Sequence, residues 1–258
     1  MQITFLGTGT SQGVPVIGCH CAVCRSVDYR DKRLRVSVHL QVQDKSIVID
    51  SGPDFRQQAL RERIDHLDAL VFTHEHKDHT AGMDDIRAYN FKQQQDMPVY
   101  AEQRVLDQLK REYAYIFAEH KYPGVPQVQT IPILTDTDPF DVQGVPFQPI
   151  RALHYKLPVL GFRVGGFTYV TDANHLSSAS LDLMRGSEVI VLNALRQEKH
   201  ISHFSLAEAV AVLEELAPRR AYLTHISHLL GRHRDVEATL PDFIRLAYDG
   251  LRISLNEE

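Results

Sequence analysis

Three histidines and two carboxylates occur within six residues of the chain, in the run HEHKDH that begins at residue 74. The run follows residues 69–72, an apolar stretch that predicts a buried strand. Neutral imidazoles and carboxylates are the usual nitrogen and oxygen ligands of Zn²⁺, Mn²⁺ and Fe²⁺. Side chains at i and i+2 of an extended chain point the same way, so His74 and His76 can hold one ion. If the chain then turns helical, Asp78 and His79 point elsewhere, and the spacing favours two adjacent ions.

Two other interpretations of this run are weaker. The HExxH helix of zinc proteases begins with the same two residues, but it requires a histidine four residues after His74, where this chain has Asp78. A surface loop that is rich in histidine by chance would not be expected to follow a buried strand so directly. The run is therefore interpreted as part of a metal site.

Polar residues also end several other predicted strands. His154, Asp172 and His225 each follow a short apolar or β-branched run. A rigid sheet positions such side chains at its edge without burying them unpaired. A dinuclear site needs additional ligands, including one carboxylate that contacts both ions. Any one of these residues alone would more often be structural, but together with the HEHKDH run they favour a shared site.

Three cysteines, Cys19, Cys21 and Cys24, lie within six residues and are the only cysteines of the chain. Zn²⁺ in closed structural sites takes four tetrahedral ligands, commonly three thiolates and one imidazole. The fourth ligand is His20 or a residue from elsewhere, and we favour His228. A redox-active trio of free thiols is the alternative. An odd, clustered number of cysteines argues against a disulfide framework and fits a reducing compartment.

The composition limits the classes of partner. The chain has 258 residues, 43% hydrophobic, and a formal net charge of −5, so no global basic field attracts nucleic acid or an anionic membrane. Its first 20 residues do not read as a secretory signal, and no apolar run reaches the roughly 18–20 residues that span a bilayer. We expect a cytoplasmic protein with neither a membrane nor a nucleic-acid partner; a homodimer stays open.

The strands and helices alternate in a way that predicts one domain over residues 1–258. Hairpin-like stretches at 36–49 and 140–170 imply antiparallel pairing, so a purely parallel doubly wound sheet is excluded. Two mixed sheets packed together, with helices outside, accommodate both kinds of pairing, which is an α/β (α+β) class. Apolar periodicity and capping signals predict helices over 53–63, 102–118 and 205–217, and a last helix just before Gly250.

The pattern HxHxDH after an apolar strand, with an Asp-Ser-Gly turn upstream and isolated His, Asp and His downstream, resembles the metallo-β-lactamase superfamily. The resemblance spans residues 7–228 and implies a four-layer αββα sandwich with a dinuclear site at one edge. It implies that Asp172 bridges the ions and that Asp50 orients a ligand. It assigns the first ion to His74, His76, His154 and Asp172, and the second to Asp78, His79, Asp172 and His225.

Within that superfamily, three segments resemble the PhnP branch: GTGTSQGVP from residue 7, GCxCxxC from residue 18 and THISH from residue 224. This branch hydrolyses a phosphoribosyl cyclic phosphate. The resemblance implies a structural zinc on Cys19, Cys21, Cys24 and His228. It also implies that His203 contacts phosphate or acts as general acid, although a surface histidine beside a helix start is the structural alternative. His203 and Asp78 are the predicted catalytic residues.

We therefore predict a metal-dependent phosphodiesterase with two active-site ions, Zn or Mn, and one structural Zn, acting on a small cyclic phosphodiester. The alternatives are a nuclease of the tRNA 3′-processing (tRNase Z) or exonuclease type, a lactonase or thioesterase of the glyoxalase II type, and a zinc-stabilised binding module with a dead site. The aromatic-rich residues 87–130 exceed the corresponding part of the branch in length. They predict a lid over the site or, alternatively, a core or dimer contact.

Overall fold

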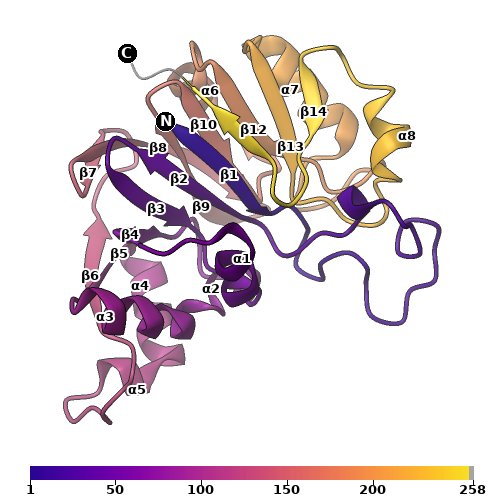
Figure 1. Cartoon of the computed structure of the whole chain (residues 1–258). Coiled ribbons are helices and arrows are strands. Elements are labelled where there is room, and N and C mark those ends of the chain that lie inside the picture. The colour runs from indigo at the N-terminus through magenta and orange to yellow at the C-terminus, as the bar shows by residue number, and fades with distance from the viewer. Residues whose placement is uncertain (256–258) are drawn as a thin grey trace.

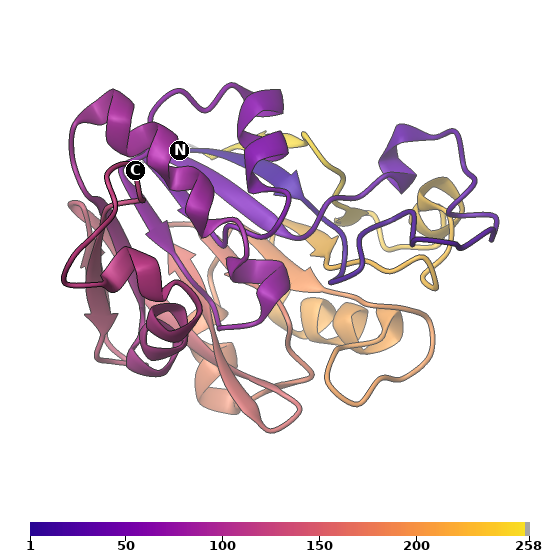
Figure 2. The ribbon, with the colours of Figure 1, turned by 90° about the horizontal axis from the view of Figure 1, so that it is seen from below.

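The computed structural model describes residues 1–255. Two β-sheets face each other, with helices on both outer faces (Figure 1, and from below in Figure 2). The first sheet has the strand order β15-β1-β2-β3-β4-β5-β6. Its strands are β1 (Gln2–Gly7), β2 (Ser37–Val42), β3 (Lys45–Ile49), β4 (Ala69–Val71), β5 (Met97–Glu102), β6 (Val128–Ile133) and β15 (Arg252–Ser254).

The second sheet has the order β11-β8-β9-β10-β12-β13-β14, and β7 pairs with β8 beside this path. Its strands are β7 (Phe140–Val142), β8 (Val145–His154), β9 (Leu157–Val164), β10 (Phe167–Val170), β11 (His175–Leu176), β12 (Val189–Asn193), β13 (Arg220–Thr224) and β14 (Ile244–Leu246). Strands β7 to β10 are joined by hairpins and pair antiparallel, whereas β10, β12, β13 and β14 pair parallel. The first sheet is mixed in the same way, antiparallel from β1 to β3 and parallel from β3 to β6. The predicted hairpins are confirmed.

Alternation along the strands places side chains in separate cores. In β3, Ile47 and Ile49 lie in the core between the sheets, and Val48 lies in a second core beneath the helices. In β12, Val191 faces the other sheet and Ile190 a third core, on the outer face. Because successive side chains of a strand point to opposite faces, both faces of each sheet are apolar and must be covered. The four-layer αββα arrangement follows from this pattern.

Three helices cover each outer face. Those on the first sheet are α1 (Phe55–Glu62), α3 (Arg87–Gln93) and α4 (Gln103–Glu112), and those on the second are α6 (Ser178–Met184), α7 (Leu206–Leu216) and α8 (His233–Glu237). Helix α7 begins with the predicted capping box, in which the Ser205 side chain accepts from the Glu208 N–H and the Glu208 carboxylate accepts from the Ser205 N–H. The short helices are α2 (Lys77–Thr80), α5 (Ala114–Phe117), and the 3₁₀ turns η1 (Tyr29–Asp31) and η2 (Met83–Ile86).

Two predicted helices differ from the structure. The predicted last helix before Gly250 is wrong, because β14 occupies that region and pairs parallel with β13, burying Ile244 and Leu246. The predicted helix over 102–118 is interrupted at Tyr113, which separates α4 from α5. The buried Tyr113 hydroxyl donates to the Thr80 carbonyl at 2.9 Å, so a tertiary contact takes precedence over helix continuation.

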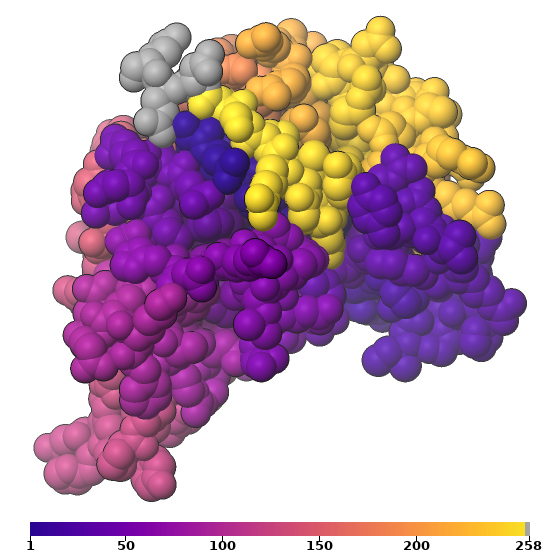
Figure 3. Space-filling model, viewed as in Figure 1, coloured from indigo at the N-terminus to yellow at the C-terminus, as the bar shows by residue number. Residues whose placement is uncertain are grey.

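The segment after α4 projects from the body of the molecule, at the lower left of Figure 3. Tyr89, Tyr113 and Ile116 of the aromatic-rich residues 87–130 are buried in the core beneath the helices, which fits the core interpretation for these side chains. Tyr122 is exposed. Within residues 1–255, no helix is long and apolar enough to cross a membrane.

Candidate metal centre

The HEHKDH run lies directly after β4, where the first sheet meets the second. The chain is extended at His76 (φ −63°, ψ 147°) and helical from Lys77 to Thr80, as predicted. The rings of His74 and His76 lie 4.6 Å apart between centroids, and those of His74 and His79 lie 4.1 Å apart. The change of backbone conformation at residue 76 thus brings the rings of His76 and His79 close to that of His74.

His154, at the end of β8, approaches the same histidines from the second sheet. Its ring lies 5.1 Å from His76 and 5.8 Å from His74. Its Nδ1 donates to the Ser202 carbonyl at 2.8 Å, which leaves Nε2 free to act as an acceptor. A ring fixed in one tautomer in this way is typical of a metal-ligating histidine.

Asp172 and His225, which follow β10 and β13, form a second group with Asp78 and His79. His79 Nε2 lies 3.2 Å from one Asp172 oxygen and 3.4 Å from Asp78, and His225 Nε2 lies 3.1 Å from the other Asp172 oxygen and 3.5 Å from Asp78. Ligands about 2.05 Å from a tetrahedral metal are about 3.3 Å apart. The four side chains thus already have the spacing of a coordination shell.

Asp50, after β3, supports this group from behind. Its fully buried carboxylate accepts from the Thr73 N–H at 2.9 Å, the Thr73 hydroxyl at 2.8 Å and His79 Nδ1 at 2.7 Å. The bond to Nδ1 directs His79 Nε2 toward Asp172. Asp50 thus lies where it can orient the His79 ring, which is the role that the resemblance implies for it.

The backbone conformation at the strand ends turns these side chains toward one another. Asp50, Asp172 and His225 all have left-handed backbone, with φ of 63°, 57° and 54°. Asp and His tolerate this region better than most residues because their side chains are short or can bond locally. Gly52 permits the close packing of the Asp50 turn on α2, since a Cβ there would lie 2.1 Å from the Asp78 carbonyl oxygen.

The charges of this buried cluster are set by its own members. Burial lowers the pKa of His74 well below its usual value, so the ring is neutral. Burial also disfavours a charged His79, but the carboxylates of Asp172, Asp78 and Asp50 raise its pKa well above the usual value. Burial opposes ionisation of Asp172 as well, yet His225 and His79 hold its pKa well below the usual range. The site is thus arranged to hold carboxylates ionised next to positive charge.

The donor atoms fit divalent metal ions. The Nε2 atoms of His74, His79 and His225 are buried and have no hydrogen-bond partner within residues 1–255. Buried nitrogen atoms are rarely left unpaired, and each such atom needs an explanation. Atoms at coordination spacing, in a set of imidazoles and carboxylates, are explained by a cation that they surround. This His/Asp cluster can bind metal.

His203 lies on the loop before α7, against the cluster. Its ring is 4.5 Å from His154 and 4.7 Å from His225, and its Nδ1 is 3.7 Å from an Asp172 oxygen. Burial lowers the pKa of His203 to about 3, so the ring is neutral at pH 7. A neutral imidazole offers one N–H donor, which suits contact with a phosphate oxygen better than donation of a proton.

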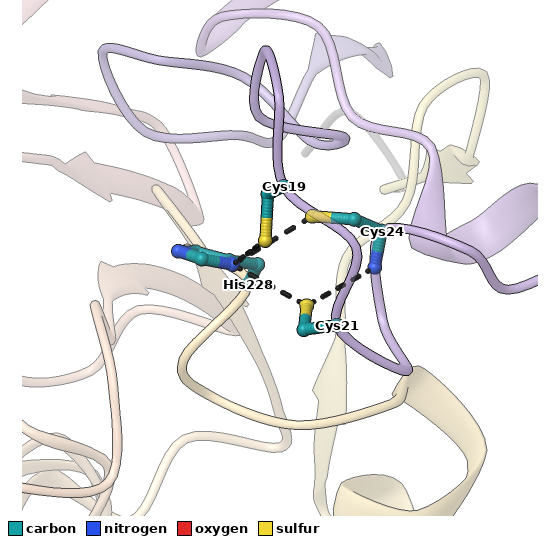
Figure 4. A group of neighbouring side chains, drawn as sticks. All are labelled: Cys19, Cys21, Cys24 and His228. Carbon is teal, nitrogen blue, oxygen red and sulfur yellow. Dashed lines mark hydrogen bonds between the residues drawn. The ribbon is translucent and has the colours of Figure 1, made fainter.

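The three thiols converge on one imidazole (Figure 4). The Sγ atoms of Cys19, Cys21 and Cys24 lie 3.3, 3.4 and 3.6 Å from His228 Nδ1. Tetrahedral zinc with Zn–S near 2.3 Å and Zn–N near 2.05 Å separates sulfur and nitrogen by about 3.5 Å. The Cys24 N–H lowers the pKa of the Cys21 thiol to about 6, whereas burial raises the pKa of the Cys24 thiol to about 11. His20 is not part of this group.

Comparison with known proteins places the chain in a family. Residues 45–226 match the model of the beta-lactamase superfamily domain. A solved structure described as a new diphosphatase from the PhnP family is 39% identical, with a TM-score of 0.92 over 99% of this chain and 98% of that chain. The chain belongs to the PhnP family of the beta-lactamase superfamily. The predicted family, fold and class of metal-dependent hydrolase are thereby confirmed.

Two further proteins are similar to this chain, one in sequence and one in fold. An octanoyltransferase of Porphyromonas gingivalis is 39% identical over 261 residues, and this chain spans about half its length, 52%. The short form of human tRNase Z has a TM-score of 0.70 with both chains fully covered, but only 19% identity, and shares the fold alone.

Some residues near the centre of this PhnP-family protein carry no sequence signal. His200 has its ring 5.2 Å from that of His203, and no local pattern predicts this position. Thr73 bonds Asp50 through both its backbone and its hydroxyl, and its place before His74 was the only hint. Tyr155 and Lys156 border the site only because they follow His154.

Replacing Asp50 by Asn should lower metal affinity about 10- to 100-fold, the usual effect of losing an outer partner of a ligand. The neutral amide no longer favours the tautomer and charge of His79 that direct Nε2 inward. Affinity is measured by competition with a chelator of known strength. Asp44→Asn is the control, because that side chain is 83% exposed and outside the site. Equal metal affinity in both variants would contradict the orienting role.

Proposed function

We propose that this PhnP-family hydrolase cleaves a phosphodiester bond of a small molecule at a pair of divalent ions. The observation that carries the proposal is the position of Asp172. Its carboxylate belongs both to the group with Asp78, His79 and His225 and to the group with His154 and His203. One carboxylate shared by two donor groups supports a bridge between two ions.

The superfamily pattern divides the donors into two sets, and the spacing of donor atoms within residues 1–255 supports the set of Asp78, His79, Asp172 and His225. His74, His76, His154 and Asp172 would hold the first ion, and Asp78, His79, Asp172 and His225 the second. When bound, such a pair supplies water activated at neutral pH and positive charge for the attacking and leaving oxygens. Zn²⁺ and Mn²⁺ both suit this mixture of imidazole and carboxylate ligands.

The protein residues have distinct tasks in the hydrolysis. The water oxygen forms a bond to phosphorus and gives up a proton to solvent. The bond from phosphorus to the leaving oxygen breaks, and the leaving oxygen takes up a proton from solvent. His203, neutral and pressed between His154 and His225, donates a hydrogen bond to a phosphate oxygen. Asp50 and the Ser202 carbonyl hold the His79 and His154 rings in place throughout.

Two substrate classes fit this chemistry. A cyclic phosphodiester such as a phosphoribosyl cyclic phosphate is the substrate that the sequence resemblance implies. A diphosphate is the second, favoured because the 39% identical PhnP-family relative is described as a diphosphatase. Both are attacked at phosphorus with expulsion of an oxygen leaving group.

Acyl chemistry is the competing class. The octanoyltransferase name belongs to a protein about twice as long as this chain, so that activity could reside in the half that this chain does not match. A lactone or thioester could also be hydrolysed by a pair of metal ions. A nuclease activity is less favoured, since the net charge of −5 gives no basic surface field for a polymer.

A substrate panel tests the proposal directly. Metal-loaded protein should turn over bis(p-nitrophenyl) phosphate and at least one of a ribosyl 1,2-cyclic phosphate, a 2′,3′-cyclic nucleotide and ADP-ribose. Chelation should abolish each activity and added Mn²⁺ or Zn²⁺ should restore it. A homoserine lactone, an octanoyl thioester and a precursor tRNA complete the panel. Turnover of an acyl substrate without any phosphate substrate would refute the proposal.

A separate structural zinc on the thiol cluster is tested by metal content. Wild-type protein should hold about three ions per chain, two in the centre and one on the cysteines. Cys21→Ser and His228→Ala should each lose about one ion and unfold at lower temperature, because structural zinc contributes folding free energy. His20→Ala is the matched control and should keep full content. Loss of zinc from His20→Ala, but not from His228→Ala, would reverse the ligand assignment.

The role of His203 is tested with leaving groups of different acidity. If His203 contacts phosphate, His203→Ala should lower kcat by roughly 10²-fold both for a p-nitrophenyl ester and for an alkyl ester of the same phosphate. His203→Gln, which keeps an N–H donor, should recover part of the loss. A defect confined to the poor alkyl leaving group would identify His203 as the general acid instead.

A further inference from the structure

The tip of the hairpin between β8 and β9 lies at the mouth of the metal centre. His154 and Leu157 are directly paired, so Tyr155 and Lys156 alone form the turn. Tyr155 has left-handed backbone with φ of 58°, a conformation in which bulky side chains are uncommon. Its side chain is nevertheless 49% exposed, so core packing does not explain the choice of an aromatic residue. Such an outlier beside a catalytic centre suggests a functional requirement.

Hydrogen bonds connect the turn at residues 155–156 to the loop before α7. The Asn174 side chain accepts from the Tyr155 N–H at 2.7 Å and donates to the Ile201 carbonyl at 3.2 Å. His154 Nδ1 adds the bond to the Ser202 carbonyl at 2.8 Å. The two segments thus form two walls beside the metal centre. Their spacing is set in part by His154, which would also hold metal.

Between these walls is a cavity of about 570 Å³ that is broadly open to solvent. Residues 155–157 form one side, residues 201–202 the other, and His76 and His154 lie at the metal end. Ile201 is 65% exposed, so both walls present uncovered apolar surface next to the centre. Cavities of this size hold small organic ligands, with a few polar groups fixing their orientation.

Lys156 is the one cation among the residues that line this cavity. Its Nζ lies 5.3 Å from the centroid of the Tyr155 ring, and no carboxylate of residues 1–255 pairs with it. Two ions at the metal end would already neutralise one phosphate group. The unpaired ammonium of Lys156 on the wall can therefore bind a second anionic group of the substrate, next to the reacting phosphate.

We propose that Lys156, Tyr155 and Ile201 form a leaving-group subsite for a linear organic diphosphate. Lys156 binds the second phosphate, and Tyr155 and Ile201 hold a ring-bearing organic group against their exposed apolar faces. This inference rests on the proposed function, since it assumes hydrolysis at phosphorus by the metal centre. It makes the turn after His154 a determinant of substrate choice, separate from the metal ligands.

Lys156→Gln tests the charge. For ADP-ribose, a linear diphosphate, kcat/KM should fall about 10- to 100-fold, chiefly through KM, as expected for loss of one charged hydrogen bond. For bis(p-nitrophenyl) phosphate, which has a single phosphate, the change should stay below about threefold by the same principle. Lys156→Arg should keep most of the diphosphate activity. Lys110→Gln, an exposed substitution on α4, is the control and should leave both substrates unchanged.

Tyr155→Gly tests the ring without a risk to folding, because glycine is favoured at a φ of 58°. Its unfolding temperature should equal or exceed that of the wild type, while ADP-ribose turnover falls and turnover of methyl diphosphate, a linear diphosphate without a ring, is kept. Equal effects on both substrates, no effect of Lys156→Gln, or phosphodiester turnover without any diphosphate turnover would each overturn the subsite. Absence of all phosphate hydrolysis would instead refute the proposed function.

Discussion

Burial of ionisable side chains where the two sheets meet is the constraint on which the structure depends. Asp50 and His79 are fully buried and Asp172 is 2% exposed. A lone charge in such a place costs several kcal/mol, so each carboxylate must face positive charge or N–H donors. Asp50 meets this condition with three donors, and Asp172, like Asp78, faces the Nε2 atoms of His79 and His225. Carboxylate and imidazole donors at coordination spacing are the reason why this cluster can bind a cation as well as form ion pairs.

Backbone hydrogen bonds connect the His/Asp cluster to the thiol cluster. His225 and His228 lie three residues apart, after β13. Ile226, between them, makes the backbone hydrogen bonds to the N-terminal loop. Ile226 accepts from the Thr10 N–H and donates to the Thr8 carbonyl, which attaches the N-terminal loop to this segment. The thiol cluster holds the other end of that loop on His228. The thiol cluster and His225 are therefore linked through the backbone of one segment.

Much of the His/Asp cluster was predictable because short stretches of sequence specify the local structure that positions its side chains. The HEHKDH run needs only a strand followed by a helical turn. The strand-end rule finds Asp172 and His225 because β10 and β13 run parallel in the second sheet, which places their ends at one edge. The helix predicted before Gly250 failed because Ile244 and Leu246 are too few to distinguish a short buried strand from a helix. Tyr113 breaks its helix through a bond to Thr80, a contact 33 residues away that no local pattern contains. His200 acquires its position from the packing of loops, whereas Lys156 acquires its position from its place after His154 in the hairpin turn.

The metal donors and the cavity walls are subject to different physical requirements. A donor such as His79 is fixed by buried hydrogen bonds, by left-handed strand ends and by glycines that permit close backbone contact, so few substitutions preserve it. Tyr155, Lys156 and Ile201 expose their side chains and contribute to the scaffold mainly through backbone groups, which Asn174 and His154 hold. A change of side chain at these wall positions leaves the core and the buried His/Asp cluster in place. The fold can therefore keep one hydrolytic centre while its choice of leaving group varies, and the wall residues are where that choice is made.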